Sequence, residues 1–575
     1  MDRNFFLALA LSFGILALWS FYMGERHPAP APPGAPPAVR EPPSTTPAEG
    51  GGSARPATAG PVREGAVPAA AEPALPEEER VFENAVFRVR LSSAGGGIER
   101  IALKHYRVSR EPDAPPVVLT TFDPDRELGL ATPLSGLGLG DQSRAPYRLV
   151  EEADGSFRFE RTVGGVTVRK IYSFEPDSYL IRLQIEVENR SDRVVAPTFE
   201  LRWPARAADG PDFTEHGLIA LHAGNAERVR WAVGGAGPSC GRGGGRIEEK
   251  VFRGEVDWAG EEARYFLAVA IPDNPREASA RFVPGPTEKS GVAVLAYPPT
   301  ALPPGQTLSR QFEAYFGPKD PRVMPQTGAR LDLAINEGWA WVAPLTRFFS
   351  WLLHACHSIV PNYGVAIILL TILVRVVTAP LMTRQMRSMK RMQEMQPRLQ
   401  EIQEKYKDDR QRQQEEMMKL WRETGFNPVA GCLPMLLQFP VFIGLYYALQ
   451  SSIDLRQAPF ILWIDDLSRP ETLFVIPGLE LPVRVLPLLM GGSMILQQKL
   501  SPTTVDPAQA RMMMTVMPVM FTLLFYQFPS GLVLYWLLSN LAAVAHQLIV
   551  NRGMQPANPR PAKPAERKRH VGRKD

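Results

Sequence analysis

An apolar run of membrane-spanning length, VAIILLTILVRVVTAPLM from Val365 to Met382, most constrains what this chain can fold into. Lipid offers no partner to backbone polar groups, so the run predicts a transmembrane helix. Arg375 lies inside the run. An arginine there costs roughly 2.5–3.5 kcal/mol on insertion scales and cannot lose its proton. No Asp or Glu occurs in a neighbouring candidate span, so water, lipid phosphate, backbone carbonyls or a passing substrate must solvate the guanidinium.

Other apolar runs predict a bundle of helices. No small-residue cleavage site closely follows the first run, so we interpret residues 1–26 as a retained N-terminal transmembrane signal anchor. A removed signal peptide is the alternative. The region 360–552 predicts five core transmembrane helices, of which the third and fourth are weak. They cover about residues 363–382, 428–449, 483–500, 512–528 and 532–550.

A Pro/Ala-rich linker at residues 27–76 leads into a strand-like region at residues 77–325. In YLIRLQIEVEN, from Tyr179 to Asn189, apolar and polar residues alternate, as in a strand with one buried face. Glycine-containing turn clusters such as Gly164-Gly165 separate the candidate strands. We therefore predict a multi-domain membrane protein, an α-helical bundle joined to an antiparallel β-sandwich.

Lys and Arg placement predicts the topology. The segment Arg384–Arg422 and the tail at 553–575 are rich in basic residues, whereas the loop Ser451–Pro482 has only Arg456 and Arg469. Both termini are therefore expected in the cytoplasm, and the loop and the β-domain outside it. A β-domain on the outer side of the membrane fits the periplasm of a bacterium with two membranes. The sequence therefore predicts a multi-pass protein of a bacterial inner membrane.

A Trp- and Phe-rich segment precedes the second span. We predict an amphipathic interfacial helix at residues 330–355, lying on the outer leaflet. A connector that packs on the bundle is a compatible alternative.

Arg375 admits two interpretations. Its side chain can snorkel to the inner headgroups, or it can line a hydrated cavity open to the cytoplasm. Polar residues in or beside other spans favour the cavity. They are Thr371 on the same span, and Gln438, Gln527, Ser539 and Asn540 on others.

Several protein classes are disfavoured. Proton-coupled transporters usually carry acidic or His relays in the membrane, and their inverted repeats are not visible here. No nucleophile–base pair or zinc-protease motif is visible, so we expect no enzyme. The three cysteines are too widely scattered for a metal site or a disulfide framework, and no cofactor or metal is expected.

The segment 384–424 predicts a cytoplasmic helical hairpin. Its first arm carries a heptad seam, and Pro397 is expected to kink or restart that arm. The seam residues are Met392, Met395, Leu399, Ile402 and Tyr406. The basic tail is either a positive-inside anchor or a contact for ribosomal RNA.

Several stretches together resemble one family, the YidC/Oxa/Alb membrane protein insertases, in its Gram-negative type with a large periplasmic domain. They include NYGVAIILLTILVRVVTAPL, MQPRLQEIQEKYKDD, FNPVAGCLPMLLQFPVFIGLYYAL and MPVMFTLLFYQFPSGLVLYWLLSNL. The resemblance covers nearly all of residues 360–552 and is looser in the β-domain. It implies insertion and folding of membrane proteins without nucleotide hydrolysis, and a β-domain of the supersandwich type.

The resemblance also implies residue roles and partners. Arg375 matches the family's groove arginine, and the hairpin matches a segment that recruits substrate. Positions lining the substrate path match Thr371, Phe439, Pro440, Phe442 and Trp536. The implied partners are nascent membrane proteins, the lipid bilayer, the Sec translocon (SecYEG and SecDF) and the ribosome, with no DNA. A solute channel or transporter and a passive assembly scaffold are the alternatives.

Overall fold

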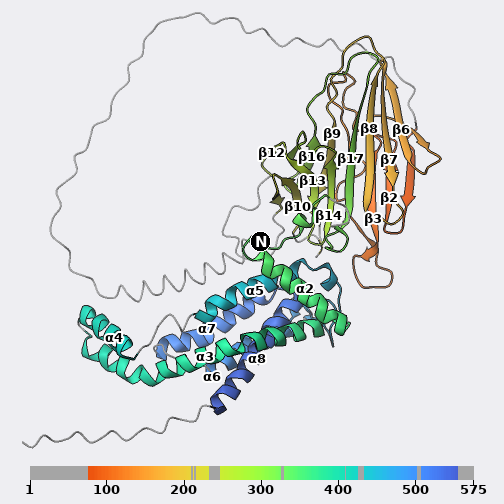
Figure 1. The fold of residues 1–575 in the computed structure, drawn as a ribbon. Helices are drawn as coiled ribbons and strands as arrows, with labels where there is room; N and C mark the ends of the chain where they lie inside the picture. The colour runs from red at the N-terminus through yellow and green to blue at the C-terminus, as the bar shows by residue number, and fades with distance from the viewer. Residues whose placement is uncertain are drawn as a thin grey trace, which may run out of the picture.

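The computed structural model describes residues 76–208, 212, 215–231, 247–324, 329–407, 409–424, 433–500 and 507–553. The predicted anchor, the linker up to residue 75 and the tail from residue 554 lie outside the described residues. A β-domain lies at one end of a group of helices, next to α2 and α5, and the short helix α4 lies at the other end (Figure 1).

Three sheets build the β-domain, and neighbouring strands in each are antiparallel, which confirms the predicted antiparallel β-domain. The strand orders are β1-β2-β3-β4, β11-β10-β13-β14-β17-β8-β7-β6-β5 and β12-β15-β16-β9. The bounds are β1 Glu79–Glu83, β2 Phe87–Ser92, β3 Gly97–Arg107, β4 Pro116–Val118, β5 Arg148–Glu151, β6 Phe157–Val163, β7 Val166–Phe174, β8 Leu180–Asn189, β9 Glu200–Arg206, β10 Gly217–His222, β11 Asn225–Arg230, β12 Lys250–Arg253, β13 Val256–Glu262, β14 Phe266–Pro272, β15 Ser279–Pro284, β16 Ser290–Ala296 and β17 Thr307–Pro318.

The alternating pattern on β8 sets which of its faces enters the core. Ile181, Leu183, Ile185 and Val187 are at most 1% exposed, and the polar residues between them reach the surface. Since side chains of a strand alternate between its two faces, this register is the one the sequence predicts. The Gly164-Gly165 pair turns the chain from β6 into β7 with positive φ angles of 55° and 76°, which glycine adopts without strain.

The helical part contains two helices long and apolar enough to cross a membrane, at Tyr363–Arg384 and Ser530–Val550, among the described residues. A shorter apolar helical segment covers Met514–Phe525. The bounds are η3 Leu331–Ala334, α2 Ala343–Ile359, α3 Tyr363–Lys405, α4 Arg410–Thr424, α5 Leu433–Ser451, η5 Ile453–Leu455, β18 Phe474–Ile476, β19 Leu481–Val483, α6 Val485–Leu500, α7 Pro507–Phe525 and α8 Ser530–Gly553.

The first membrane helix and the first arm of the expected hairpin are one continuous helix. α3 runs through both Pro380 and Pro397, so it does not restart at Pro397 as the sequence suggested. Pro397 is exposed, and the backbone carbonyl that it leaves unbonded can be solvated. The second arm, α4, packs back against α3 and buries Leu420.

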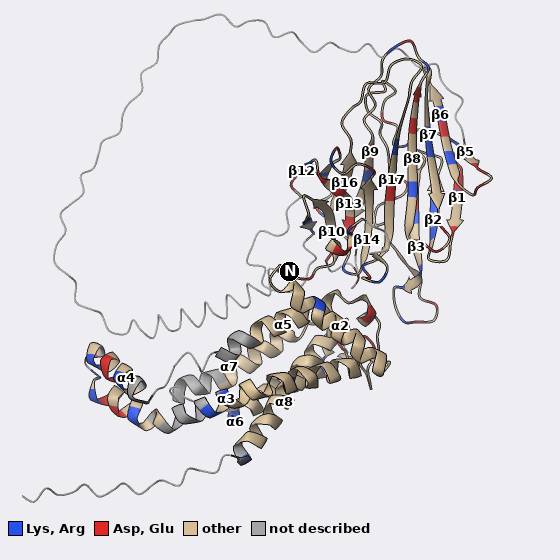
Figure 2. Ribbon diagram, in the orientation of Figure 1, with Lys and Arg blue, Asp and Glu red and all other residues tan. Residues whose placement is uncertain are grey.

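Charge separates the two parts of the molecule. Acidic and basic residues are spread over the β-domain and around α4, whereas the helices between them are nearly free of both (Figure 2). This distribution is typical of a helical bundle in lipid with polar regions on either side.

Candidate functional site

Arg375 lies about 18 Å along α3 from its first residue, at 1.5 Å per residue. The helix begins at Asn362, whose side chain accepts a hydrogen bond of 3.1 Å from the Val365 N–H. The half-buried guanidinium turns towards α8, where its Nε donates to the Ser539 Oγ at 3.1 Å and its Nη2 donates to the same oxygen. The charged side chain is therefore held between two apolar helices by a neutral hydroxyl.

One stripe of α8 supplies polar groups to α3 and α5. Tyr535, Ser539 and His546 lie at intervals of four and seven residues, which puts them on one helix face. The Gln438 Nε2 donates to the Tyr535 hydroxyl at 3.4 Å, and the His546 Nε2 lies 3.0 Å from the Thr383 hydroxyl oxygen. Along α8 the stripe therefore contacts first α5, then Arg375, and last Thr383, near the basic part of α3.

A second stripe of α8 contacts α6. The Asn540 side chain donates to the Ser493 Oγ at 3.0 Å, and the Gln547 side chain donates to the Leu500 carbonyl. Seven residues separate Asn540 from Gln547, so they share a face. α8 thus joins α3, α5 and α6 through polar contacts, none of which includes an acidic side chain.

The predicted substrate-path residues lie beside an aromatic cluster. The rings of Phe442 on α5 and Trp536 on α8 meet edge-on at 4.6 Å between centroids. Phe525 and Phe521 on α7 lie 4.9 and 5.9 Å from the Trp536 ring. Phe442 is only 6% exposed, whereas Phe439 and Pro440, which precede it on α5, are partly exposed.

Thr371 lies one helical turn before Arg375 with its hydroxyl bonded inside its own helix, whereas Gln527 lies at another end of the bundle. The Thr371 hydroxyl donates to the Ile367 carbonyl of its own helix at 2.6 Å, and the residue is 1% exposed. Gln527 is exposed in the turn between α7 and α8. The neighbouring Ser530 N–H donates to the Arg469 carbonyl, which places this turn at the end of the bundle near the β-domain.

The hairpin residues lie far from the arginine along α3. Met395 is twenty residues beyond Arg375, about 30 Å along a helix. Leu399, Ile402 and Tyr406 are partly buried beside α4. Met392 lies in α3, and its side chain lies outside the described part.

Sequence reasoning missed Tyr535, which belongs to the polar stripe, and Thr383, which contacts it. Tyr535 lies four residues before Ser539, and this helical spacing was the signal that could have identified it. Thr383 comes directly after the apolar run and gave no signal of its own. In the described part of the chain, no three His, Cys, Asp or Glu side chains gather as a candidate metal site.

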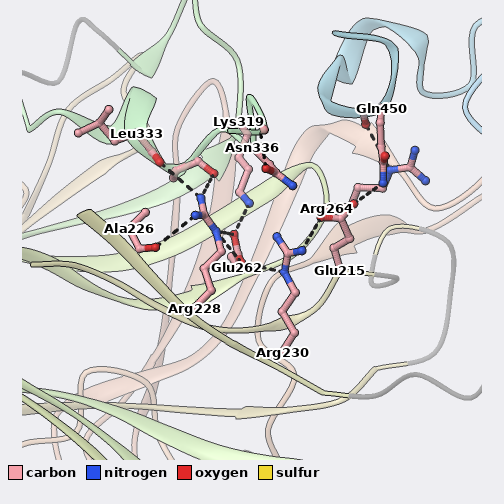
Figure 3. Close-up of polar contacts among 12 residues, drawn as sticks. Glu215, Ala226, Arg228, Arg230, Glu262, Arg264, Lys319, Leu333, Asn336 and Gln450 are labelled. Carbon is pink, nitrogen blue, oxygen red and sulfur yellow. Dashed lines mark hydrogen bonds and ion pairs between the residues drawn. The ribbon is translucent and has the colours of Figure 1, made fainter. Parts of the chain in front are cut away.

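Buried charges join the β-domain to the outer end of α5 (Figure 3). Lys319, Arg228 and Arg230 surround the fully buried Glu262, at 2.8, 3.2 and 3.2 Å. Burial alone would raise the pKa of this carboxyl, but the three cations outweigh burial and hold the pKa at about 2. Arg230 also pairs with Glu215 at 3.0 Å, and the Gln450 side chain of α5 donates to Glu215.

Two further ion pairs fix the segment that follows α5. Arg456 and Asp212 pair at 2.7 Å with both side chains buried. Asp454 accepts from Arg322 of the β-domain and contacts His354 of α2, each at 2.7 Å. The bond to Asp454 raises the pKa of His354. The β-domain is therefore attached to α5 and α2 by polar contacts.

Comparisons with known proteins agree along the chain. Residues 355–558 match the family model "60Kd inner membrane protein", and residues 80–352 match "YidC periplasmic domain". The chain is 34% identical to the membrane protein insertase YidC of Pelobacter propionicus, over 96% of this chain and 99% of the relative. It is 32% identical to that of Syntrophus aciditrophicus, over 96% and 100%. The crystal structure of an active YidC insertase aligns with 82% of this chain and with 92% of its own chain, at 18% sequence identity and a TM-score of 0.35.

These matches define the class, an inner-membrane insertase with a periplasmic domain, which is not an enzyme. The chain belongs to the YidC family of membrane protein insertases. Its substrates are membrane proteins.

Proposed function

We propose that this insertase receives the polar part of a nascent membrane segment at Arg375, in a hydrated groove open to the cytoplasm. The observation that carries this proposal is the environment of the guanidinium. Among the described residues no carboxylate lies within 4.0 Å of Arg375, and the Ser539 hydroxyl is its hydrogen-bond partner. One hydroxyl uses only part of the five N–H donors of an arginine. Water and then a polar or acidic substrate group supply the remaining acceptors.

In this proposal the apolar part of the substrate passes along Phe439, Pro440, Phe442 and Trp536 into lipid. Burial of apolar surface drives this movement at about 25 cal/mol per Å². Partial exposure of Phe439 and Pro440 supports their role as first contacts. Phe442 and Trp536 are packed together and would have to separate locally as a segment passes.

The wider arrangement is also part of the proposal. It has five core spans and an N-terminal anchor, cytoplasmic termini, and a periplasmic β-supersandwich. The α3–α4 hairpin recruits substrate, and the protein works alone or beside the Sec translocon, without nucleotide hydrolysis. The position of α4 at the end opposite the β-domain supports a cytoplasmic hairpin (Figure 1).

A charge series at Arg375 tests the groove. Arg375→Ala should reduce insertion of a single-span substrate with an acidic outer tail, and Arg375→Glu should reduce it further, because the acidic tail then meets a like charge. Arg552→Ala is the control, since it removes an exposed charge from α8, outside both the groove and the hairpin. The measurement is protease protection of the tail in proteoliposomes. If both Arg375 variants insert the substrate as the native chain does, Arg375 is structural and the groove proposal fails.

Crosslinking tests the path separately. A photoreactive residue at Phe439 should crosslink to a stalled nascent chain. The same residue at Val519 of α7, which is 53% exposed, serves as the control on another helix. Equal crosslinking from both positions would exclude a path along α5.

A further inference from the structure

The chain between α5 and α6 contains a short hairpin with exposed apolar side chains. β18 and β19 pair antiparallel, with Phe474 opposite Val483 and Ile476 opposite Leu481. Phe474 is 53% exposed, Leu481 48%, and Leu479 at the turn 73%. Apolar side chains gathered on so small an element mark a surface that meets something other than water.

The hairpin is fixed to the outer ends of α6 and α7. The Tyr526 hydroxyl, just after α7, donates to the Pro482 carbonyl of β19. Arg484, between β19 and α6, donates to the Tyr526 carbonyl and lies 5.0 Å from the Tyr526 ring centre. The Glu471 carboxylate accepts from the Leu486 N–H at 2.7 Å. The hairpin is therefore held as a direct extension of the helix ends.

The hairpin directly precedes α6, which also exposes apolar side chains. Leu488 and Leu489, near the start of α6, are 54% and 51% exposed, on a helix that the proposed topology places in the membrane. The apolar part of α6, Val485–Leu496, spans only about 18 Å, whereas the hydrocarbon core is roughly 30 Å thick. A span shorter than the hydrocarbon core is accommodated by local thinning of the bilayer or by residues that flank it. The hairpin flanks α6 at its start.

We propose that the hairpin Leu473–Val483 inserts into the outer leaflet and binds the acyl chains of phospholipids beside α6 and α7. Phe474, Leu479 and Leu481 contact lipid, and Glu480 stays among the headgroups and limits the depth. The inference rests on the proposed topology, which places the loop between α5 and α6 on the outer side. Lipid is the proposed occupant because the hairpin directly precedes α6, whose exposed leucines face lipid in the same topology.

Spin-label accessibility in lipid nanodiscs tests the inference. The full chain, with its three native cysteines replaced by serine, carries a nitroxide at Phe474→Cys or Leu479→Cys. Collision with oxygen, which dissolves in lipid, is compared with collision with a water-soluble nickel chelate. We expect several-fold greater oxygen preference at both positions than at Val194→Cys, a residue of the β-domain that is 60% exposed.

Leu488→Cys separates failure of the inference from failure of the topology. If Leu488→Cys prefers oxygen while both hairpin positions match Val194→Cys, the hairpin lies in water and the inference is wrong. If the label at Leu488→Cys also collides more with the nickel chelate than with oxygen, α6 is not in lipid. The proposed topology and this inference then both fail. Nanodiscs that hold a single copy of the chain contain no partner besides the scaffold protein at the rim, so oxygen preference at the hairpin identifies lipid as the occupant.

Discussion

The β-domain and the helical bundle expose different kinds of side chain to their surroundings. In the β-domain the apolar residues of β8 are inside and fully buried, and ion pairs cover the surface. On α3 the apolar residues Val376 and Val377 are 66% and 69% exposed, whereas Thr371 on the same helix is 1% exposed. Water drives apolar groups inwards, but lipid does not. The difference shows that one chain folds against two solvents.

The two regions also differ in how they hold charge. Glu262 is buried among three cations, each within 3.2 Å. Arg375 has a hydroxyl partner and, among the described residues, no carboxylate in reach. A fully paired buried charge fixes a structure, while an incompletely paired one leaves donors for a ligand. The first arrangement is suited to holding domains together and the second to transient binding.

The largest effect is expected from unpairing the buried charges. Glu262→Gln should destabilise the β-domain by about 3–5 kcal/mol, because Lys319 and two arginines remain buried without their carboxylate. Glu313→Gln, which removes a half-exposed partner of Arg182, should cost about 0–1 kcal/mol. Pulse proteolysis of the full chain in urea measures both. Similar costs for the two variants would show that the Glu262 cluster does not hold the domain together.

A matched pair of leucines compares the two solvents directly. Leu183→Ala in the β-domain should cost about 2–5 kcal/mol, since it leaves a cavity in a packed core. Leu373→Ala on α3, where the side chain is 43% exposed, should cost less than about 1 kcal/mol. Urea unfolding of the β-domain and detergent unfolding of the bundle give the two values. A larger cost at Leu373 would show that a partner helix, and not lipid, covers it.

Lys170 makes the stability of the β-domain depend on pH. It is fully buried, its amine donates to the Gly95 carbonyl, and it lies 4.8 Å from the Tyr147 ring centre. Burial lowers its pKa from 10.5 to about 7, so the unfolded chain binds more protons between these values. Stability should therefore rise with pH through that window, by at most about 1.4 kcal/mol per pH unit.

The variant Lys170→Met provides the comparison, because it keeps most of the volume and removes the charge. Urea midpoints from pH 7 to pH 9 should rise for the native chain and rise less for the variant. Parallel curves for the two would contradict a titrating Lys170.

The smallest effect is expected where the two regions meet. His354 faces Asp454, with Arg322 and Asp320 beside that carboxylate. The hydrogen bond to Asp454 raises the pKa of His354, so its contribution is fully present below about pH 6.5, the unfolded value, and is lost as pH rises through the raised folded value. Melting of the full chain at pH 6 and pH 8 should show this loss. His354→Gln should reduce the loss, and His357→Gln, at a residue that stacks on Tyr363, should not.

Local patterns predicted much of this structure, and pairings over long distances were not predictable. The alternation in β8 and the apolar run of α3 each follow from one sequence window. The contact of Arg375 with Ser539 joins residues 164 positions apart, and it depends on how α3 packs against α8. For the hairpin of β18 and β19 the sequence predicts only a loop on the outer side, because three-residue strands are too short to show a period.

Because α3 is a continuous helix, the number of residues between two of its positions gives their distance along the helix. Arg375 and Leu399 both belong to α3, 24 residues apart, so about 36 Å separates them as measured along the helix. An extended polypeptide advances about 3.3–3.6 Å per residue. A nascent chain held at Leu399 therefore needs roughly ten more extended residues before its next group reaches the guanidinium. Under the proposed function, α3 therefore sets a minimum length for a substrate segment that contacts the hairpin and Arg375 at once.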